Sequence, residues 1–460
     1  MPGGGIVDAD VIVIGGGAGG EAAGFQAPDI GARAVLIERS LVGGECPFWA
    51  CMPSKTLLNS AARRAGGLDV SWEHASARRD WMISRERIDF PDDSGHVRRL
   101  EAAGTRVVRG EARIVGPGTV QVAGGEDEGT IRADSIVVAA GSAPFIPPIP
   151  GLDAVPYWTS REATSTRALP SSLVVLGGGV VGVEMAQVFI RFGVRVTLIE
   201  GGERILSRDH PLTSAAVTDQ LVEEGLDLRT GVTASAVRAG GAGRIVELSD
   251  GSTVEGAELL VAVGRRPADL RALGVEEAGA TLGDRGAAAP DDQLRIADGL
   301  FVAGDAAGGL QFTHVADYEG ALAVRAALGR ADRADLRAVP KVTFTDPEAA
   351  AVGLTVEEAR ANGVDAFEVS RDFASTGKGQ TIEGARGHLT AVVDADRGRL
   401  VGAFAACPGA GELIHEAVLA MKLDVPLDVL ADTIHAFPTS ARVFGGVFQE
   451  AAKRSARATS

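Results

Sequence analysis

The sequence predicts an α/β fold in which one strand–loop–helix arrangement occurs twice. Short uninterrupted apolar segments recur along the chain, and such segments are typical of parallel strands buried on both faces. Two of them run directly into a glycine-rich loop, at residues 15–20 and 177–182. Aromatic residues make up only 5% of the chain, which suits small side chains packed closely between helices and sheets.

Seven apolar segments are expected to form strands, and the chain is long enough for about three domains of roughly 150 residues each. The segments are residues 11–14, 34–37, 136–138, 173–176, 194–199, 259–263 and 300–302. A Pro-rich stretch at residues 144–150 is typical of a linker. Residues 265–300 are rich in Gly, Ala and Asp, and mixed strand and helix signals begin at Val339. These changes mark the candidate domain boundaries.

The first glycine loop, residues 15–20, fits the pattern G-x-G-x-x-G between a strand and a helical run. Glycines at these positions let the backbone approach a pyrophosphate at the helix N-terminus. The strand that follows ends in Glu38, a carboxylate that can accept hydrogen bonds from ribose hydroxyls. The segment therefore predicts a dinucleotide site.

The second glycine loop, residues 177–182, repeats this pattern, and the next strand ends in Glu200. A carboxylate at that position binds a free 2′-hydroxyl and repels a 2′-phosphate. No arginine occupies the position, although Arg204 and Arg208 follow nearby. The sequence therefore predicts NAD rather than NADP at this second site.

Two of the three cysteines, Cys46 and Cys51, lie five positions apart behind a Gly-Gly turn. Residues i and i+5 of a straight helix are too far apart for an unstrained disulfide, so we expect Cys46 before the helix or in a distorted first turn. Pro47 suits the first helical position. Cys51 is then expected in the first turns, where free N–H groups lower a thiol pKa. The pair predicts a redox-active disulfide.

Composition excludes several functions. The net charge of −16 argues against nucleic acid and anionic membrane surfaces as partners. No apolar run is long enough to span a bilayer, and residues 1–5 lack the charged and apolar regions of a signal peptide. Three cysteines do not form a secreted disulfide framework, so a cytoplasmic location is expected, with Cys407 in the core and no bound metal ion.

Together these motifs resemble those of the pyridine nucleotide–disulfide oxidoreductases, which include dihydrolipoamide dehydrogenase, glutathione reductase and mercuric reductase. The resemblance covers nearly all of the chain and includes both glycine loops and the cysteine segment 46–55. Four further motifs carry it: residues 140–142 (Ala-Gly-Ser), 264–267 (Gly-Arg-Arg-Pro), 303–305 (Ala-Gly-Asp) and 344–348 (Phe-Thr-Asp-Pro-Glu). The last looks like the start of the family's dimerisation domain.

The resemblance implies a homodimer of α/β chains, each with two Rossmann-like nucleotide-binding domains and a C-terminal α+β dimerisation domain. The expected divisions are an FAD-binding domain at residues 1–149, an NAD-binding domain at 150–268, a central domain at 269–338 that completes the FAD site, and a dimerisation domain at 339–460. The active site is expected to be shared across the dimer interface.

The resemblance also assigns roles to single residues. Cys51 would be the thiol next to the flavin, and Cys46 the thiol that exchanges with a small-molecule substrate. Lys55 would lie near the flavin and pair with Glu184, where an ammonium favours negative charge on the reduced flavin. The expected FAD contacts are Gly15, Gly17, Ala18, Gly20, Glu38, Arg39, Gly44, Glu45, Lys55, Ala112, Ala140, Gly141, Gly304, Asp305 and Thr313. The expected NAD contacts are Gly177, Gly179, Gly182, Glu200 and Gly264.

The chain departs from the family near its C-terminal end. Thiol-active members carry a His-Pro-Thr motif whose His, supplied by the partner subunit and oriented by a Glu, moves protons for the exchange thiol. Here Phe437 occupies the His position and Arg442 the Glu position. Neither can act as a base. His435 lies two positions earlier, on the same face of an extended segment, and is either a replacement base or an inherited feature.

The predicted function is an FAD- and NAD-dependent oxidoreductase with a redox-active disulfide and a substrate other than lipoamide or glutathione disulfide. The alternatives are a diaphorase-like reductase of quinones or specialised metabolites, in which the disulfide is a relay or a bystander, and a flavoprotein without turnover that acts as a dimeric scaffold. Metal-ion reduction is less favoured, because the sequence has no C-terminal cysteine pair. Phe48, Trp49 and Phe437 either form an apolar substrate wall or pack in the interior.

Overall fold

The structure is a computed structural model that describes residues 7–84, 91–125, 127–241, 243–330 and 332–458. The segment Met1–Gly5, whose composition is unlike a signal peptide, lies outside the described residues. The chain folds into two compact units. The first unit comprises Met1–Thr56, Ser76–Phe145 and Gly264–Ala334, and the second comprises Leu57–Ala75, Ile146–Val263 and Asp335–Ser460.

The first unit is built on a largely parallel sheet in the order β16-β17-β6-β1-β2-β3, with β4 and β5 joined to β6 as an antiparallel extension. The strands are β1 (Val7–Ile14), β2 (Ala34–Glu38), β3 (Arg106–Arg109), β4 (Glu111–Gly116), β5 (Thr119–Ala123), β6 (Gly129–Val138), β16 (Arg295–Ala297) and β17 (Leu300–Val302). A separate antiparallel pair joins β7 (Ser142–Pro144) to β15 (Arg265–Pro267). The helices are α1 (Ala18–Asp29), α2 (Glu45–Phe48), α5 (Ser94–Ala103) and α9 (Thr313–Ala327), with parts of α3 (Cys51–Ala65) and α4 (Trp72–Ser84).

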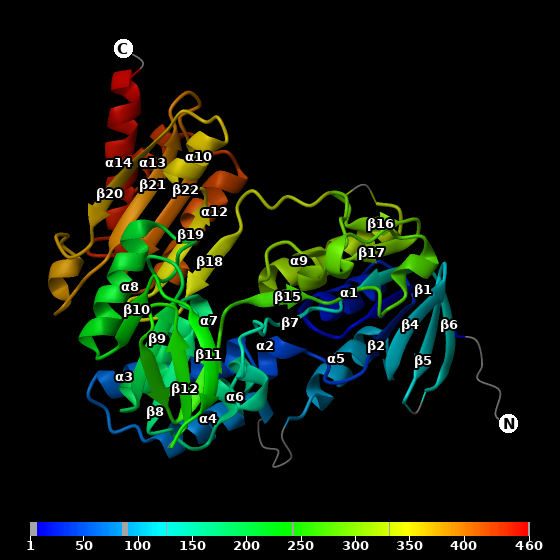
Figure 1. Ribbon diagram of the computed structural model, residues 1–460. Helices are drawn as coiled ribbons and strands as arrows, with labels where there is room; N and C mark the ends of the chain where they lie inside the picture. The colour runs from blue at the N-terminus through cyan, green and yellow to red at the C-terminus, as the bar shows by residue number, and fades with distance from the viewer. Residues whose placement is uncertain (1–6, 85–90, 126, 242, 331, 459–460) are drawn as a thin grey trace. The chain divides into compact units, whose positions relative to one another are not determined.

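Both faces of this sheet are covered, which explains its uninterrupted apolar strands. Alternate residues such as Val11 and Val13 pack against α1, α5 and α9, and α1 and α9 lie side by side (Figure 1). Residues of the opposite parity, such as Ile12 and Ile14, pack against β4, β5 and the segment near Val275. Burying a side chain of this size contributes about 1.5–3 kcal/mol, so these two apolar layers stabilise the unit.

The nucleotide half of the second unit repeats this plan. Its parallel sheet has the order β10-β9-β8-β14, and a three-stranded antiparallel sheet β11-β12-β13 accompanies it. The elements are α6 (Ser160–Ser165), β8 (Ser172–Leu176), α7 (Val180–Arg191), β9 (Arg195–Glu200), α8 (Pro211–Glu223), β10 (Asp227–Thr230), β11 (Ala234–Ala239), β12 (Arg244–Leu248), β13 (Thr253–Gly256) and β14 (Glu258–Val261). One face packs on helices and the other on the three-stranded sheet.

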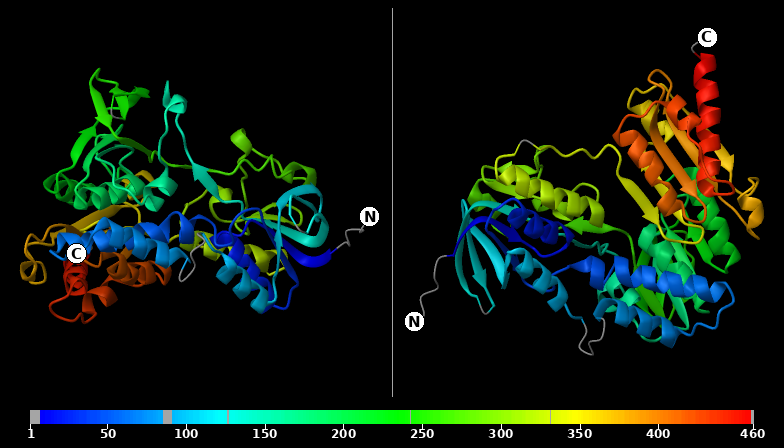
Figure 2. Two further views of the ribbon diagram at one scale, coloured as in Figure 1. Left: turned by 90° about the horizontal axis from the view of Figure 1, so that it is seen from below. Right: turned by 180° about the vertical axis from the view of Figure 1, so that it is seen from behind.

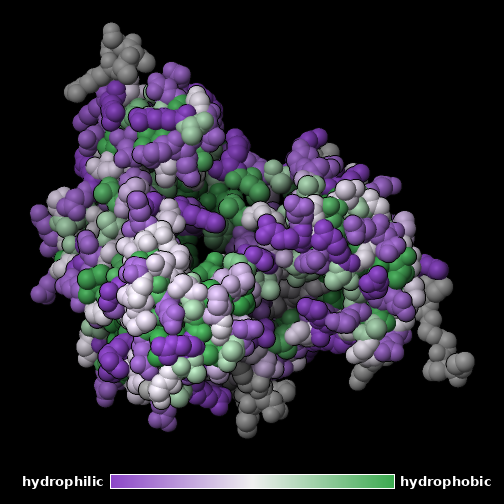
Figure 3. All heavy atoms as spheres, viewed as in Figure 1, coloured by the Kyte–Doolittle hydropathy of each residue, from purple (hydrophilic) through white to green (hydrophobic). Residues whose placement is uncertain are grey.

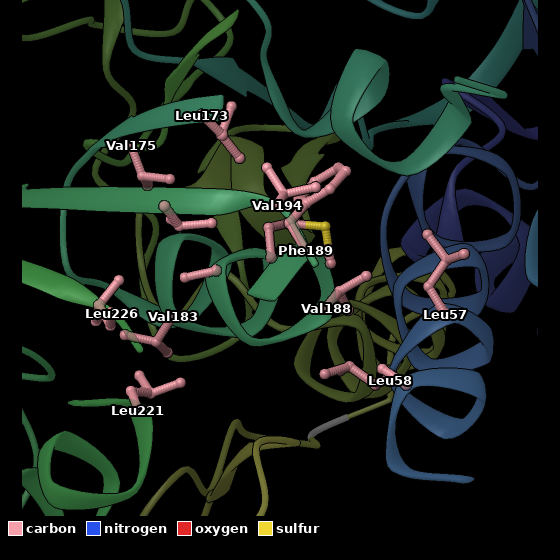
Figure 4. Packing of buried hydrophobic residues seen from close by; sticks show 14 of the residues in the cluster. Leu57, Leu58, Leu173, Val175, Val183, Val188, Phe189, Val194, Leu221 and Leu226 are labelled. Carbon is pink, nitrogen blue, oxygen red and sulfur yellow. The ribbon is translucent and has the colours of Figure 1, made fainter. Parts of the chain in front are cut away.

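The helical segment Leu57–Ala75 belongs to the core of the second unit. Leu57 and Leu58 of α3 share a buried cluster with Val188 and Phe189 of α7 (Figure 4). The predicted first domain, residues 1–149, includes this segment, so that range does not coincide with one compact unit. The four-domain division stays a prediction.

The C-terminal half of the second unit is an antiparallel sheet in the order β18-β19-β22-β21-β20. Helix α14 lies against β20 and β21 on one face (Figure 2). The elements are β18 (Pro340–Thr343), β19 (Ala349–Gly353), α10 (Val356–Ala361), β20 (Ala366–Asp372), β21 (His388–Asp394), β22 (Arg399–Ala406), α11 (Ala410–Leu413), α12 (His415–Lys422), α13 (Leu427–Asp432) and α14 (Ser440–Ala458).

Two buried histidines tie this sheet to α8. His388 makes hydrogen bonds to the hydroxyls of Thr213 and Thr390, both at 2.8 Å, and its ring lies 5.2 Å from that of His210. Burial and the charge of His210 lower the pKa of His388 to about 3. The ring is therefore neutral at physiological pH and serves packing.

Hydrophilic side chains cover much of the face seen in Figure 3, between smaller apolar areas. Among the residues that the structure describes, no helix is long and apolar enough to cross a membrane. Cys407 follows β22 and is fully buried, and burial raises its pKa to about 12. The prediction that Cys407 is a core residue is confirmed.

Candidate active site and nucleotide-binding loops

The first glycine loop connects β1 to α1 and requires glycine for two reasons. Gly15 has φ +101°, and a Cβ on Gly20 would collide with the carbonyl oxygen of Gly15. The loop also touches the following turn, because a Cβ on Gly44 would lie 2.8 Å from the Cα of Gly17. Gly17 is the N-cap of α1 and offers no side chain to its N–H groups. The backbone N–H groups at the start of α1 therefore have no side-chain cap and are suited to bind a pyrophosphate.

Glu38 closes this site at the end of β2. Its carboxylate accepts hydrogen bonds from the backbone N–H groups of Gly16 and Ser40, both at 2.6 Å. These two bonds fix the carboxylate beside the loop, where a ribose would lie. Arg39 is exposed and lies 3.6 Å from Glu111. The residues present fit a dinucleotide with an adenosine ribose.

The second glycine loop reproduces this geometry between β8 and α7. Gly177 has φ +103°, and a Cβ on Gly182 would collide with its carbonyl oxygen. Gly179 is the N-cap of α7 and again offers no side chain. Glu200 accepts from the N–H groups of Gly178 and Gly202, both at 2.7 Å. The two predicted dinucleotide loops therefore share one local structure.

The Arg204 side chain is bonded to the backbone of its own loop. Its guanidinium donates to the carbonyl oxygens of Leu206 at 3.1 Å and Ser207 at 2.9 Å. A guanidinium held in this way is occupied by backbone acceptors, whereas the Glu200 carboxylate lies beside the ribose position. The arrangement fits a cofactor with a free 2′-hydroxyl.

The cysteine segment has Cys46 before the long helix and Cys51 at its start, as expected. Cys46 lies in the four-residue helix α2, the chain breaks at Trp49, and Cys51 is the first residue of α3. Pro47 is the third residue of α2, so the expectation that it takes the first helical position is wrong. The reason is local: the N–H groups of Trp49 and Ala50 both return to the Glu45 carbonyl, which ends α2. This break brings the two cysteines together.

The two thiols share a hydrogen bond that separates their pKa values. The hydrogen bond with Cys46 lowers the pKa of Cys51 to about 6, and the Thr313 hydroxyl and the Lys55 charge act in the same direction. The Thr313 Oγ1 atom lies 3.3 Å from the Cys51 Sγ atom. The same hydrogen bond, burial and the charge of Cys51 raise the pKa of Cys46. One reactive thiolate therefore sits beside one protonated thiol.

Asp305 is held by a small polar network at the end of β17. Its carboxylate accepts from the Ser142 hydroxyl at 2.5 Å, and that hydroxyl accepts from Arg265 Nε at 2.8 Å. Gly304 donates its N–H to the buried carboxylate of Glu319 at 2.8 Å. Sequence reasoning did not single out Ser142, Arg265 or Glu319 as site residues, although the first two lie in motifs that it quoted.

The other predicted cofactor residues lie in loops or on the edges of these elements. Gly141 and Gly264 have φ values of +71° and +120°, and Phe145 donates its N–H to the Gly264 carbonyl at 2.9 Å. Ala112 lies on β4 and Ala140 follows β6. Ala18 begins α1, and Glu45 lies 3.9 Å from Arg265.

Lys55 and Glu184 belong to different units. Lys55 is on α3, and its charge lowers the pKa of Cys51. Glu184 is a buried residue of α7, and its carboxylate accepts the N–H of Phe344 at 2.9 Å. Their pairing stays a prediction.

His435 is already engaged within its own subunit. Its Nε2 lies 2.9 Å from the Glu416 carboxylate and its Nδ1 lies 3.0 Å from the Thr433 carbonyl oxygen. Both ring nitrogens therefore already have partners within the same subunit. A Cβ on Gly445 would collide with this ring, so α14 leaves room for it. A ring held by Glu416 and Thr433 in this way is engaged away from a thiol of another subunit.

Phe437 and Arg442 sit on the surface of the chain. Phe437 is 75% exposed, and Arg442 forms no ion pair within the described ranges. Phe48, in contrast, is 1% exposed and packs against His96 with ring centroids 5.6 Å apart. Packing is therefore the outcome for Phe48, while Phe437 remains free to face a partner or a substrate.

Comparison with known proteins places these sites in a family. The family described as pyridine nucleotide-disulphide oxidoreductase matches residues 9–320, and the dimerisation domain of the same enzymes matches residues 339–447. A mercuric reductase of Streptomyces lividans is 35% identical over 94% of both chains. A dihydrolipoyl dehydrogenase of Geobacillus stearothermophilus is 30% identical over 97% of this chain and 96% of its own.

Solved structures agree. The HOCl-induced flavoprotein disulfide reductase RclA of Escherichia coli is 27% identical, with a TM-score of 0.85 over 96% of this chain and 99% of its own. LpdA of Mycobacterium tuberculosis is 28% identical, with a TM-score of 0.85 over 97% of this chain and 99% of its own. The predicted family, fold class and flavin and pyridine-nucleotide cofactors are confirmed. The chain belongs to the pyridine nucleotide-disulphide oxidoreductase family.

Proposed function

We propose that this protein is an FAD-dependent, NADH-linked reductase that passes electrons through Cys46 and Cys51 to a disulfide other than lipoamide or glutathione disulfide. The observation that carries the proposal is the thiol pair itself. One hydrogen bond divides it into a thiolate, Cys51, with a pKa of about 6, and a protonated thiol, Cys46. Such a division suits a pair in which one sulfur is tuned for an internal electron acceptor and the other for an external substrate.

The residues of the first unit would hold FAD. The first glycine loop would take the pyrophosphate, Glu38 the ribose and Asp305 the ribityl chain. When bound, FAD accepts two electrons from a pyridine nucleotide and delivers them to a disulfide. The chain's own contribution is to place the Cys51 sulfur at the start of α3, where Lys55 and Thr313 favour its negative charge.

The residues of the second unit would hold NADH. The second glycine loop would take the pyrophosphate, and Glu200 would accept hydrogen bonds from both ribose hydroxyls. Repulsion between this carboxylate and a 2′-phosphate supports NADH over NADPH. Glu184 would pair with Lys55 and so order the ammonium near the flavin.

The substrate is inferred from what surrounds the exchange thiol. Phe437 stands where relatives have a base, and Arg442 stands where they have its orienting carboxylate. The His435 ring is already bonded to Glu416 and Thr433. Loss of a general base typically costs about 10²–10⁴-fold in rate. Lipoamide and glutathione disulfide should therefore be poor substrates.

The chain carries the family's dimerisation domain, which supports a homodimer. The exposed large apolar side chains of this domain support it further. They include Leu419, Leu423, Val429, Ile434 and Phe437, each more than half exposed in the single chain. A second subunit would cover such side chains. We propose that the active site is shared across this interface, that the chain divides into the four domains named above, and that the protein is cytoplasmic.

An anaerobic titration with NADH tests the proposal. The purified holoprotein is reduced stepwise while the visible spectrum and the electrons consumed are recorded. Uptake of two electrons beyond those of the flavin, with a long-wavelength band at the first two-electron stage, is expected. Reduction of the flavin alone would remove the cysteines from the electron path.

A second candidate function is the reduction of a quinone or another apolar ring compound. The exposed Phe437 in the base position favours it, since an aromatic surface there would receive a flat ring. The buried Phe48 does not contribute to such a wall. Cys46→Ser separates the two functions, because quinone turnover that survives this substitution unchanged would show that the thiols are bystanders.

Metal-ion reduction has less support, although mercuric reductases are among the relatives. The only cysteine beyond the pair is Cys407, which is fully buried with a raised pKa. It cannot hand a metal ion to Cys46 from the surface.

A further inference from the structure

We propose that Arg265 is a positioning residue for the flavin: acting through the Ser142 hydroxyl, it holds the Asp305 carboxylate in place for the ribityl chain. The inference deepens the proposed function and rests on it in one respect, because that function gives the ribityl chain to Asp305. Arg265 and Ser142 have no place among the predicted cofactor contacts. All three residues belong to the first compact unit.

The side chains of Arg265 and Ser142 meet across a short antiparallel pair of strands. Ser142 begins β7, Arg265 begins β15, and Ser142 is directly opposite Pro267. Because residues two apart on a strand share a face, Arg265 lies on the same face as Pro267 and is a diagonal neighbour of Ser142. Arg266 lies on the opposite face, where its guanidinium carbon is 3.6 Å from the ring centroid of Phe145.

Three hydrogen bonds join these side chains into a relay that ends on Asp305. Arg265 donates from Nε to the Ser142 hydroxyl oxygen at 2.8 Å and from a terminal nitrogen to the Ser142 carbonyl oxygen at 2.9 Å. The Ser142 hydroxyl donates its own hydrogen to Asp305 Oδ2 at 2.5 Å. A charged donor polarises the hydroxyl and so strengthens this last bond. The guanidinium therefore fixes the hydroxyl, and the hydroxyl fixes one oxygen of the carboxylate.

The second oxygen of the Asp305 carboxylate is left for a ligand. Its Oδ1 atom forms no hydrogen bond with any residue in the described ranges, and the side chain is 22% exposed. A carboxylate that is fixed by one oxygen can accept a hydrogen bond from a ribityl hydroxyl with the other. It then loses little conformational freedom when the flavin binds, which favours affinity.

Arg265 also offsets the negative charge of this site. Its Nε atom lies 4.0 Å from Asp305 Oδ2, and a terminal nitrogen lies 3.9 Å from the carboxylate of Glu45, the residue before Cys46. Two carboxylates beside one guanidinium leave a net negative charge, and FAD carries a negatively charged pyrophosphate. Loss of the Arg265 charge should therefore weaken FAD binding through repulsion as well as through the relay. Loss of the Ser142 hydroxyl affects the relay alone.

The dissociation constant of FAD tests the relay, and it is measured from the fluorescence of the flavin that is released when the holoprotein is diluted. Arg265→Gln removes the guanidinium, Ser142→Ala removes the hydroxyl, and Ser142→Thr retains it. Arg266→Gln is the matched control, because it removes the same charge from the next residue of β15 on the other face of the strand.

We expect Arg265→Gln and Ser142→Ala each to raise the FAD dissociation constant by about tenfold or more, as is usual for loss of a hydrogen bond to a charged group. The double variant should bind FAD within about threefold of Arg265→Gln alone, because both changes break one relay. Ser142→Thr and Arg266→Gln should stay within about threefold of the parent. In Asp305→Ala protein, Ser142→Ala should have no further effect.

Parental FAD affinity in Ser142→Ala would overturn the inference. A double variant whose effect is the product of the two single effects would also overturn it, since Arg265 and Ser142 would then act independently. So would a loss in Ser142→Thr as large as in Ser142→Ala, because damage to β7 would explain both. Failure of the proposed role of Asp305 looks different: Asp305→Ala itself would then bind FAD as tightly as the parent.

Discussion

The hydrogen bond between the two thiols is the largest cause of the low pKa of Cys51, and it can be tested by substituting Cys46 alone. Cys46→Ser keeps a hydroxyl donor, whereas Cys46→Ala removes the donor. Neither variant can form a disulfide, so Cys51 is a thiol in both. With a pKa of about 6, Cys51 is about 90% thiolate at pH 7. At its ordinary value of 9.0, it would be about 1% thiolate.

The Ala variant should fall between these limits, because Thr313 and Lys55 still favour the thiolate while burial opposes it. We expect a midpoint near pH 6–7 for Cys46→Ser and about 1–2 units higher for Cys46→Ala, which is about 1.4–2.7 kcal/mol of thiolate stabilisation. The assay is the rate of Cys51 alkylation by iodoacetamide between pH 5 and pH 10.

The pH midpoint of the alkylation rate reports the pKa of Cys51, whereas the rate at a single pH does not. Intrinsic thiolate nucleophilicity falls as the pKa falls, so the two effects partly cancel in a single rate. The long-wavelength absorbance of the holoprotein should titrate with the same midpoint. Equal midpoints in the Ser and Ala variants would refute the assignment of the low pKa to the Cys46 hydrogen bond.

Three further predictions concern other parts of the chain. Glu200→Gln should lower the preference for NADH over NADPH in kcat/KM by at least about tenfold, because a hydrogen bond to a charged group contributes about 1.5–3 kcal/mol. His388, with a pKa of about 3 when folded against 6.5 otherwise, takes up a proton on unfolding below about pH 6.5, so stability falls as the pH falls. This loss is about 2 kcal/mol at pH 5, and urea unfolding of His388→Asn should lack it between pH 8 and pH 5. Phe437→His combined with Arg442→Glu should raise lipoamide turnover by about tenfold or more in a steady-state assay, and no gain would show that the missing base does not limit that reaction.

The glycine loops were predictable because they are local. A position that needs positive φ or leaves no room for a Cβ is occupied by glycine, which is visible in the sequence. The strand that ends in Glu38 or Glu200 follows each glycine loop at the same spacing along the chain. The same loop geometry then follows twice from the same residues. The burial of Cys407 was equally predictable, because a residue within an apolar run is expected in a core whichever elements pack around it.

Other features of the structure depend on contacts between distant residues, which the spacing of residues along the sequence does not reveal. The break at Trp49 depends on which N–H groups return to the Glu45 carbonyl, so the sequence left the position of Cys46 open. Leu57 and its neighbours form an amphipathic helix whose pattern does not say which core it joins. The bond of His435 to Glu416 joins the loop between α13 and α14 to helix α12.

The C-terminal substitutions and the thiol pair lead to one conclusion about proton handling. The hydrogen bond that makes Cys51 a thiolate also keeps the proton on Cys46, so the exchange thiol depends on an acceptor more than an isolated cysteine would. The C-terminal segment carries Phe437 and Arg442, which accept no proton, and a histidine ring at position 435 that is already bound to Glu416. Turnover should therefore depend on the leaving thiol, with the fastest reactions for disulfides whose thiolates need no proton.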